Sequence, residues 1–478
     1  MMVWHIVKRE LFDHINSLRF ALTTFIMIAL MVTNAIVHLQ KHAKQTKEYS
    51  KNVTTSINKL KAYKRLYTLV QKGPGELYKR PSALSFIADG GEAFFPKLVA
   101  NDNSWTAGDV KSIATVGYPE TKQKSKNLRP PGVPLDWVFI ITYLFSFIPI
   151  LFSFDALSGE REHGTLRLCL ANPISRSLIV VSKFLGILIA IVLPFTFAFL
   201  LNITILSTSP WIQFDTADWG YLALVFLIVC CYACIFISVG LMVSARLERR
   251  MSLVVLLLIW VIVVVFMPLT LGTLAVKWSA PIQTVHQFRA TKREFINNTR
   301  TEKSRKWIQM KRDIDRNIAE KDELLPILRF KMEWVNYDRQ MRENLNLEYL
   351  MAQIKQVQQA RIVCRLSPAA TVQYALESMA ATGLNRHLQF VENVQLYTKQ
   401  FRQFIVEIDS TDTESLHLIG IPEGMSNKPI TPEQIPIFED KPTFRDSFNS
   451  ALVDMSLLVL FAGVFLSGAC LCFLRAEV

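Results

Sequence analysis

The residues with the clearest spacing for chemistry are His38 and His42, which stand four positions apart. Two histidines at that spacing lie on one face of an α-helix, where both rings could bind the same metal ion. No third ligand is evident in the sequence nearby, and Lys41 and Lys44 would repel a cation. We therefore expect two histidines at a membrane interface and no metal site.

Other catalytic chemistry has little basis in the sequence. The chain has no G-x-x-x-x-G-K-[ST] phosphate loop, so we expect that it does not hydrolyse ATP alone. The tripeptide Leu157-Ser158-Gly159 is superficially similar to an ATPase signature, but it adjoins an apolar block and has no phosphate loop to act with. No compact group of a nucleophile and a base is visible. These observations predict a chain with no catalytic residues and no cofactor of its own.

Long apolar blocks dominate the elements that must carry any site. Of 478 residues, 51% are hydrophobic and 19% are charged, and the mean hydropathy is +0.25. At 1.5 Å per residue, six blocks can cross about 30 Å of hydrocarbon. They are residues 20–39, 137–154, 178–206, 221–243, 252–276 and 451–474. The pattern predicts an all-α integral membrane protein with six transmembrane helices.

The short loops predict the orientation of these helices. Basic residues gather in loops 155–177 and 244–251, whereas loop 207–220 has no Lys or Arg. We expect the protein to lie in the inner (cytoplasmic) membrane of the cell. The positive-inside rule then puts both termini, residues 1–19 and 475–478, in the cytoplasm. The lysines that follow the first block favour the opposite orientation. They begin a long loop, however, and long loops cross the membrane largely regardless of their charge. They are Lys41, Lys44, Lys47 and Lys51.

The net charge of +13 could suggest a nucleic-acid partner. The basic residues lie between the membrane spans, however, so they are better interpreted as orientation signals and contacts to lipid headgroups. A basic helix after the first block could contact anionic lipid or an acidic partner, and a merely solvated helix face is at least as compatible. We expect no nucleic-acid binding.

Two long segments, 40–136 and 277–450, should form a mostly helical extracytoplasmic domain. In the second, apolar residues recur at spacings of three and four, and Pro326 should divide the stretch into two helices. Ser367-Pro368 has the form of a helix start, and Gly383 that of its stop. The proline-rich chain beyond Gly420 should be extended.

The loop between the second and third blocks carries the most informative pattern. It reads E-R-E-H-G-T-L from Glu160 to Leu166, then N-P-I-S-R to Arg176, with Lys183 inside the next block. Gly159 can end the second span, and residues 160–171 can form a short amphipathic helix along the membrane surface. Such an element could transmit force from a cytoplasmic partner. An ordinary loop whose arginines set topology is an equally good interpretation of the residues alone.

This run, together with the six-span layout and an amphipathic N-terminal helix at residues 1–19, resembles the signature of ABC-2 type ABC exporter permeases. The resemblance implies a coupling helix that contacts a cytoplasmic ABC ATPase, and this partner would bind ATP and Mg²⁺. The implied contact residues are Glu160, Arg161, Glu162, Gly164, Thr165 and Leu166. Arg176 and Lys183 would sit where substrate enters from the cytoplasm. The resemblance also implies that the chain pairs with a second permease protomer, either identical or related.

A second resemblance concerns the long insertions. The stretches L-S-P-A-A from Leu366 and M-A-A-T-G-L from Met379 are similar to permeases of multi-copper enzyme maturation and of the gliding type. Family members with short loops lack such insertions, so we do not expect this chain to share their substrates. The insertions could also dock an extracytoplasmic protein.

Polar residues within the third block have two interpretations. Thr196, Asn202 and Thr204 could line a conduit, although hydrogen bonding between helices accounts for them better. The core of each span lacks Asp, Glu, Lys and Arg, which ion-coupled transporters usually need. Their absence indicates that transport by this chain would use an external energy source. We thus expect a permease subunit of an ATP-driven exporter; the alternative is a scaffold that transmits force to an outside partner without moving substrate.

Overall fold

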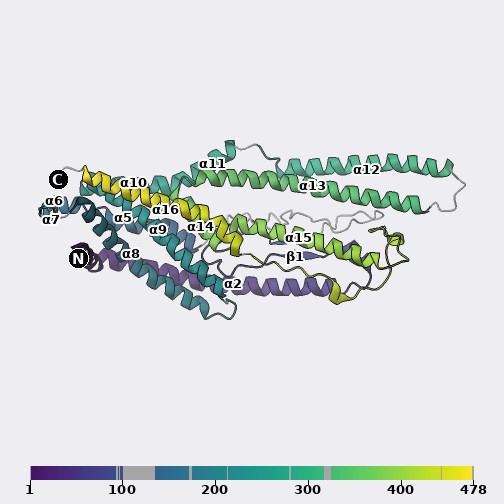
Figure 1. Ribbon diagram of the computed structural model, residues 1–478, viewed down its shortest axis with the longest axis horizontal. Coiled ribbons are helices and arrows are strands. Elements are labelled where there is room, and N and C mark those ends of the chain that lie inside the picture. The colour runs from purple at the N-terminus through teal and green to yellow at the C-terminus, as the bar shows by residue number, and fades with distance from the viewer. Residues whose placement is uncertain are drawn as a thin grey trace.

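The computed structural model describes residues 2–92, 95, 97–100, 135–171, 175–212, 214–278, 281–316, 324–442 and 444–475. It is an elongated, almost wholly helical molecule (Figure 1). Both termini lie at one end, beside α6 and α7, and the tips of α12 and α13 lie at the other. We call the end with the termini the proximal end. The part formed by residues 41–100 and 281–442 is called the distal region.

Within the described residues, six candidate membrane spans confirm the predicted all-α membrane architecture. Four of them are single helices, α2 (Leu18–Lys61), α8 (Arg176–Ser207), α9 (Thr216–Arg246) and α16 (Phe444–Leu474). The second joins α4 (Trp137–Phe139), a π-helical turn at Ile140–Phe145 and α5 (Ser146–Ser153). The fifth joins α10 (Arg249–Trp260), a second π-helical turn at Val261–Phe266 and α11 (Met267–Trp278). Helix α9 packs against α16, and α8 against α1 (Met2–Ile15) and α2 (Leu18–Lys61).

Helix α2 is much longer than the first span. It runs unbroken for 44 residues, so by helix geometry it extends about 66 Å. The Oγ atom of Ser17 accepts a hydrogen bond from the Phe20 amide and caps its start. No Gly or Pro interrupts it, which explains why the membrane span and the expected basic helix form one rod. A four-residue link then leads to α3 (Leu66–Lys72), which ends at Gly73.

The distal region consists of a helical hairpin and a compact lobe. The hairpin joins α12 (Val285–Arg316) to α13 (Leu324–Cys364), where the rings of Phe288 and Tyr349 stack 4.1 Å apart. Pro326 lies in the first turn of α13, where a missing amide proton costs nothing. The expected division into two helices therefore holds, with Pro326 just inside the second helix.

Helix α14 (Pro368–Met379) begins as predicted, with Ser367 at the N-cap and Pro368 first. The prediction that Gly383 stops it is wrong. The helix ends at Met379, and Gly383, with a φ of +74°, begins α15 (Gly383–Ser410). Buried alanine and leucine side chains cover α14, which packs between α16 and α9 in the same hydrophobic core as the spans. The distal region is thereby continuous with the membrane bundle.

The lobe has a core of its own beneath α15. Phe390, Phe401, Leu66 and Ile430 pack together there, so the lobe uses residues of both insertions. Strands β1 (Glu76–Tyr78) and β2 (Leu98–Ala100) pair antiparallel, with Leu77 opposite Val99. The proline-rich stretch is extended apart from single turns at Pro422–Gly424 and Pro432–Gln434, as expected.

Candidate coupling site

The loop that the sequence singles out forms two short helices, α6 (Ser158–Glu162) and α7 (Thr165–Leu170). A single helix over 160–171 was expected. Gly164 divides it, because its φ of +71° is a left-handed conformation that ends one helix and starts the next. Gly159, expected to end the second span, is instead an interior residue of α6.

Helix α6 is fastened to the end of α9 by buried hydrogen bonds. The Oγ atom of Ser244 accepts from the amides of Leu157 and Ser158, both at 3.1 Å. The Arg161 guanidinium donates to the carbonyl oxygens of Ala245 at 3.2 Å and of Leu247 at 2.6 Å. These carbonyls lie at the C-terminus of α9, where cations are favoured. Arg161 thus holds α6 rather than facing a partner.

Lys183 links α6 to two further elements. Its Nζ atom lies 2.6 Å from a carboxylate oxygen of Glu10 on α1 and 2.9 Å from one of Glu160 on α6. Its side chain is 3% exposed. A buried ammonium between two carboxylates satisfies both its charge and its donors. Next to it, Gly186 leaves room for Glu10, since an added Cβ would come within 2.8 Å of the Glu10 Cβ.

A second ionic cluster fixes the start of the loop. Asp155 accepts from Arg19 on α2 at 3.1 Å and from Arg249 on α10 at 3.0 Å. The Arg249 amide in turn donates to the Glu162 carboxylate at 3.2 Å. Together with the Lys183 cluster, these bonds join α6 and the turn that precedes it to helices α1, α2, α8, α9 and α10.

Burial also shapes the charge of α1 at this site. His14 lies against Phe152, with its Nε2 atom 3.8 Å from a Glu10 carboxylate oxygen. Burial lowers the pKa of His14, and the attraction of Glu10 opposes this only in part. The cluster therefore contains a neutral imidazole at neutral pH.

The outward surface of the loop is small and mixed. Glu162, His163 and Arg167 are exposed, and Leu168 is 71% exposed, whereas Leu166 is buried. Thr165 donates its hydroxyl proton to the Glu160 carbonyl at 3.2 Å, so it braces the turn at Gly164. An exposed leucine among charged side chains is a surface suited to a protein partner.

The two residues expected where substrate would enter are not brought together. Lys183 is enclosed by its carboxylates, and Arg176 donates to the Leu474 carbonyl at 3.3 Å. The sequence shows that both residues are basic, but it does not show whether a basic side chain is buried in an ion pair or exposed.

The expected conduit residues likewise have local partners. Thr196 and Thr204 donate back to carbonyls of their own helix, those of Val192 and Leu200, both at 2.8 Å. Asn202 is fully buried and donates to the Met31 carbonyl at 2.6 Å and to the Asn34 side chain at 3.1 Å. Asn202 therefore joins α8 to α2, which is the alternative interpretation given by the sequence.

The His38 and His42 rings stack 5.4 Å apart and are buried. Among the described residues, no group of three or more His, Cys, Asp or Glu side chains is placed to hold a metal ion. Sequence reasoning missed Glu10, Asp155, Ser244 and Arg249 as members of the coupling site. Their signal was weak: Asp155, Ser244 and Arg249 are polar residues close to the end of an apolar block, and Glu10 is one charged residue of the N-terminal helix.

With this geometry established, comparison with known proteins identifies the family. The family model of the ABC-2 family transporter protein matches residues 4–478. The chain belongs to the ABC-2 transporter family. A probable ABC transporter permease protein NosY of Pseudomonas aeruginosa is similar to it, with 38% identity over 56 residues. That match covers 12% of this chain and 20% of the relative, so the chain spans about a fifth of the relative's length in it.

This ABC-2 protein is thus a membrane permease subunit of an ABC transporter, as the sequence resemblance implied. Subunits of this kind are generally not catalytic, and the family implies a cytoplasmic ATPase partner.

Proposed function

We propose that this permease exports a substrate with energy from ATP hydrolysed by a separate cytoplasmic ATPase, which would bind the nucleotide and Mg²⁺. The proximal end, with both termini, faces the cytoplasm of a cell whose inner membrane holds the protein. The distal region lies outside. Helices α6 and α7 form the coupling element that contacts the ATPase.

The observation that carries this proposal is the fastening of α6. A push on the exposed side of α6–α7 cannot be absorbed by a loose loop, because Lys183, Arg161 and Asp155 tie α6 and the turn before it to five helices. Packed helices respond to such a force by small rigid-body shifts. ATP-driven closure of an ATPase dimer would therefore rock the spans against one another.

Partner contacts follow from the surfaces of the spans. In the most hydrophobic window of each, only 11% of the residues of the fifth span and 17% of those of the sixth are buried. These apolar surfaces need lipid or a second protomer, either identical or a sibling. We favour a dimer of permeases, with two ATPase subunits on its cytoplasmic side and an extracytoplasmic protein docked on the distal region.

The test is purification of the full chain from its native membranes in mild detergent. We expect an ATPase with a phosphate loop to co-purify, and its rate of ATP hydrolysis to change when the permease is removed. Repeated purification of the permease without any such ATPase would contradict the proposal.

A second function is favoured by α2, which joins Arg19 at the proximal end to the distal region as one helix. The same stroke could act on an outside partner without moving a substrate. A structure of the dimer separates the two: a continuous polar cavity between protomers supports export, and a sealed interface packed by leucines supports force transmission.

A further inference from the structure

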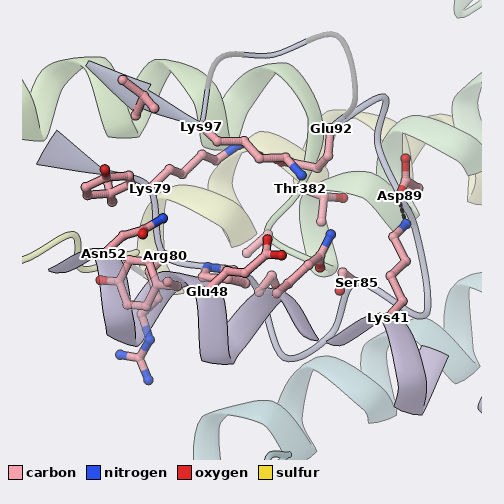
Figure 2. Close-up of a pocket in the computed structure, with 17 residues that line it drawn as sticks. Lys41, Glu48, Asn52, Lys79, Arg80, Ser85, Asp89, Glu92, Lys97 and Thr382 are labelled. Carbon is pink, nitrogen blue, oxygen red and sulfur yellow. Dashed lines mark hydrogen bonds and ion pairs between the residues drawn. The ribbon is translucent and has the colours of Figure 1, made fainter. Parts of the chain in front are cut away.

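A cavity of about 280 Å³ opens in the distal region, just beyond the predicted end of the first span at residue 39 (Figure 2). One wall is a single face of α2, with Lys41, Glu48 and Asn52. The segment that follows β1 and the start of β2 form the opposite wall, and the α14–α15 corner, with Thr382, closes one end. The cavity therefore lies where the two insertions meet the long membrane helix.

Two ion pairs brace these walls and use up four of the lining charges. Lys41 pairs with Asp89, and Lys79 with Glu92 at 2.6 Å. The Lys79 side chain is 4% exposed, and burial lowers its pKa while Glu92 opposes this. Both pairs are internally neutral, so they shape the cavity without giving it a net charge.

Two charges of opposite sign then remain across the cavity. Glu48 stands on the α2 wall and Lys97 on the opposite wall, and neither forms an ion pair within the described part of the chain (Figure 2). Arg80 also borders the cavity, but its guanidinium points away from the interior.

The remaining lining supplies hydrogen bonds and apolar contact. Within the described residues, no protein group bonds the side chains of Gln45, Asn52 or Ser85. Tyr49 and Tyr78 add aromatic surface, and burial raises the pKa of Tyr49, which keeps its hydroxyl protonated. Polar side chains without partners that converge on one cavity, next to aromatic surface, are typical of a small-molecule site.

We propose that this cavity binds a small zwitterion, a molecule that carries a primary ammonium and, a few ångströms away, a carboxylate or phosphate. Glu48 receives the ammonium and Lys97 the anionic group, while the tyrosine rings contact the body of the ligand. A simple anion would meet Glu48 and a simple cation would meet Lys97, so either would be disfavoured.

This chemistry has two sources. One is a soluble amino acid or dipeptide. The other is the phosphoethanolamine headgroup of a lipid, since Lys41 lies close to the predicted membrane boundary. Binding would occur whether or not the permease moves a substrate, so its test is independent of the proposed export.

The experiment uses the full chain in phosphatidylcholine nanodiscs, whose lipid has no N–H donor on its ammonium. Calorimetry measures the binding of the dipeptide Ala-Tyr, of its N-acetyl form and of its C-terminal amide. A parallel arm adds phosphatidylethanolamine to the nanodiscs and measures, by native mass spectrometry, how much of it stays bound. We expect Ala-Tyr or phosphatidylethanolamine to bind, and each blocked dipeptide to bind at least about tenfold more weakly than Ala-Tyr.

The variants Glu48→Gln and Lys97→Gln should each weaken binding about tenfold, whereas Lys44→Gln, on an exposed neighbouring position of α2, should not. All three side chains are exposed, and an unchanged melting temperature verifies the fold. The proposal is overturned if neither probe binds at roughly 10 mM, if the N-acetyl dipeptide binds as well as Ala-Tyr, or if Glu48→Gln and Lys97→Gln bind like wild type.

Discussion

The Nζ atom of Lys183, seven residues into α8, lies 2.9 Å from a carboxylate oxygen of Glu160 on α6. This contact fastens the proposed coupling element directly to α8, the transmembrane helix that follows it in the chain. Because Lys183 also binds Glu10, the N-terminal helix moves with them. Helices α1, α6 and α8 thereby form one mechanical unit at the proximal end.

Replacement of Lys183 by Met should separate this unit. Two carboxylates would be left facing each other without their buried ammonium, and removal of one member of a buried ion pair costs about 3 kcal/mol. We expect a lower unfolding temperature and a loss of ATP-driven activity. Both are measured on the purified complex, by thermal unfolding and by ATP turnover.

The charge itself is tested by Lys183→Met combined with Glu10→Gln and Glu160→Gln. If repulsion between the carboxylates causes the loss of stability, this triple variant recovers most of the unfolding temperature. A triple variant as unstable as Lys183→Met would mean that packing around the lysine stem, and not its charge, holds α1 and α6 together.

Gly240 on α9 should tolerate no side chain. A Cβ there would lie 1.7 Å from the Ser153 Oγ atom and 2.6 Å from its Cβ, so α5 and α9 would have to separate. We expect Gly240→Ala to destabilise by about 2 kcal/mol, with partial rescue by Ser153→Gly. Gly220 is the matched control on the same helix, because a Cβ there meets nothing within 4 Å. Thermal unfolding of Gly220→Ala should match or exceed wild type.

Asn202 should contribute to the contact of α8 with α2. Asn202→Leu removes the buried hydrogen bonds to the Met31 carbonyl and to Asn34, and interhelical bonds of this kind contribute about 1 kcal/mol in membranes. Thr204→Val, at an exposed position on the same helix, should leave the unfolding temperature unchanged. Equal effects of the two substitutions would show that the contact is not specific.

His387 in α15 should make the distal region sensitive to acid. Burial, followed by the charges of Lys79 and Arg386, lowers the pKa of His387 to about 4. The unfolded chain binds its proton near pH 6.5, so stability is complete above that pH. It falls between about pH 6.5 and pH 4, by at most about 3 kcal/mol.

The variant His387→Phe keeps an aromatic ring for the stack with Phe95, whose centroid lies 5.0 Å away, and cannot bind a proton. Between pH 7.5 and pH 5 its unfolding temperature should fall less than that of wild type. The same decrease in both proteins would assign the acid sensitivity to other groups.

The sequence predicted those structural elements that are determined by residues close together in the chain. Apolar blocks of spanning length and the Ser367-Pro368 start of α14 depend on neighbours in the chain, and both appear in the structure. The division of the coupling loop at Gly164 also has a local cause, but a glycine in an amphipathic run can equally be an ordinary helical residue.

The partners of charged residues could not be predicted in this way. Lys183 meets a glutamate 173 positions earlier, and Asp155 an arginine 136 positions earlier. Such contacts follow from how α1, α2 and α8 cross, which no spacing along one helix reports. The burial of α14 among the spans has the same origin, since its alanines suit a soluble helix as well as a membrane core.

The retention of the ATPase by a permease altered at Leu168 tests the coupling site most directly. Leu168 is 71% exposed on α7, so Leu168→Glu should leave the fold and unfolding temperature unchanged. Lys8→Glu, on the exposed face of α1, introduces the same carboxylate elsewhere at the proximal end. The account predicts that Leu168→Glu loses most of the co-purifying ATPase and its ATP-driven activity while Lys8→Glu keeps both. Full retention of ATPase and activity by Leu168→Glu would contradict it.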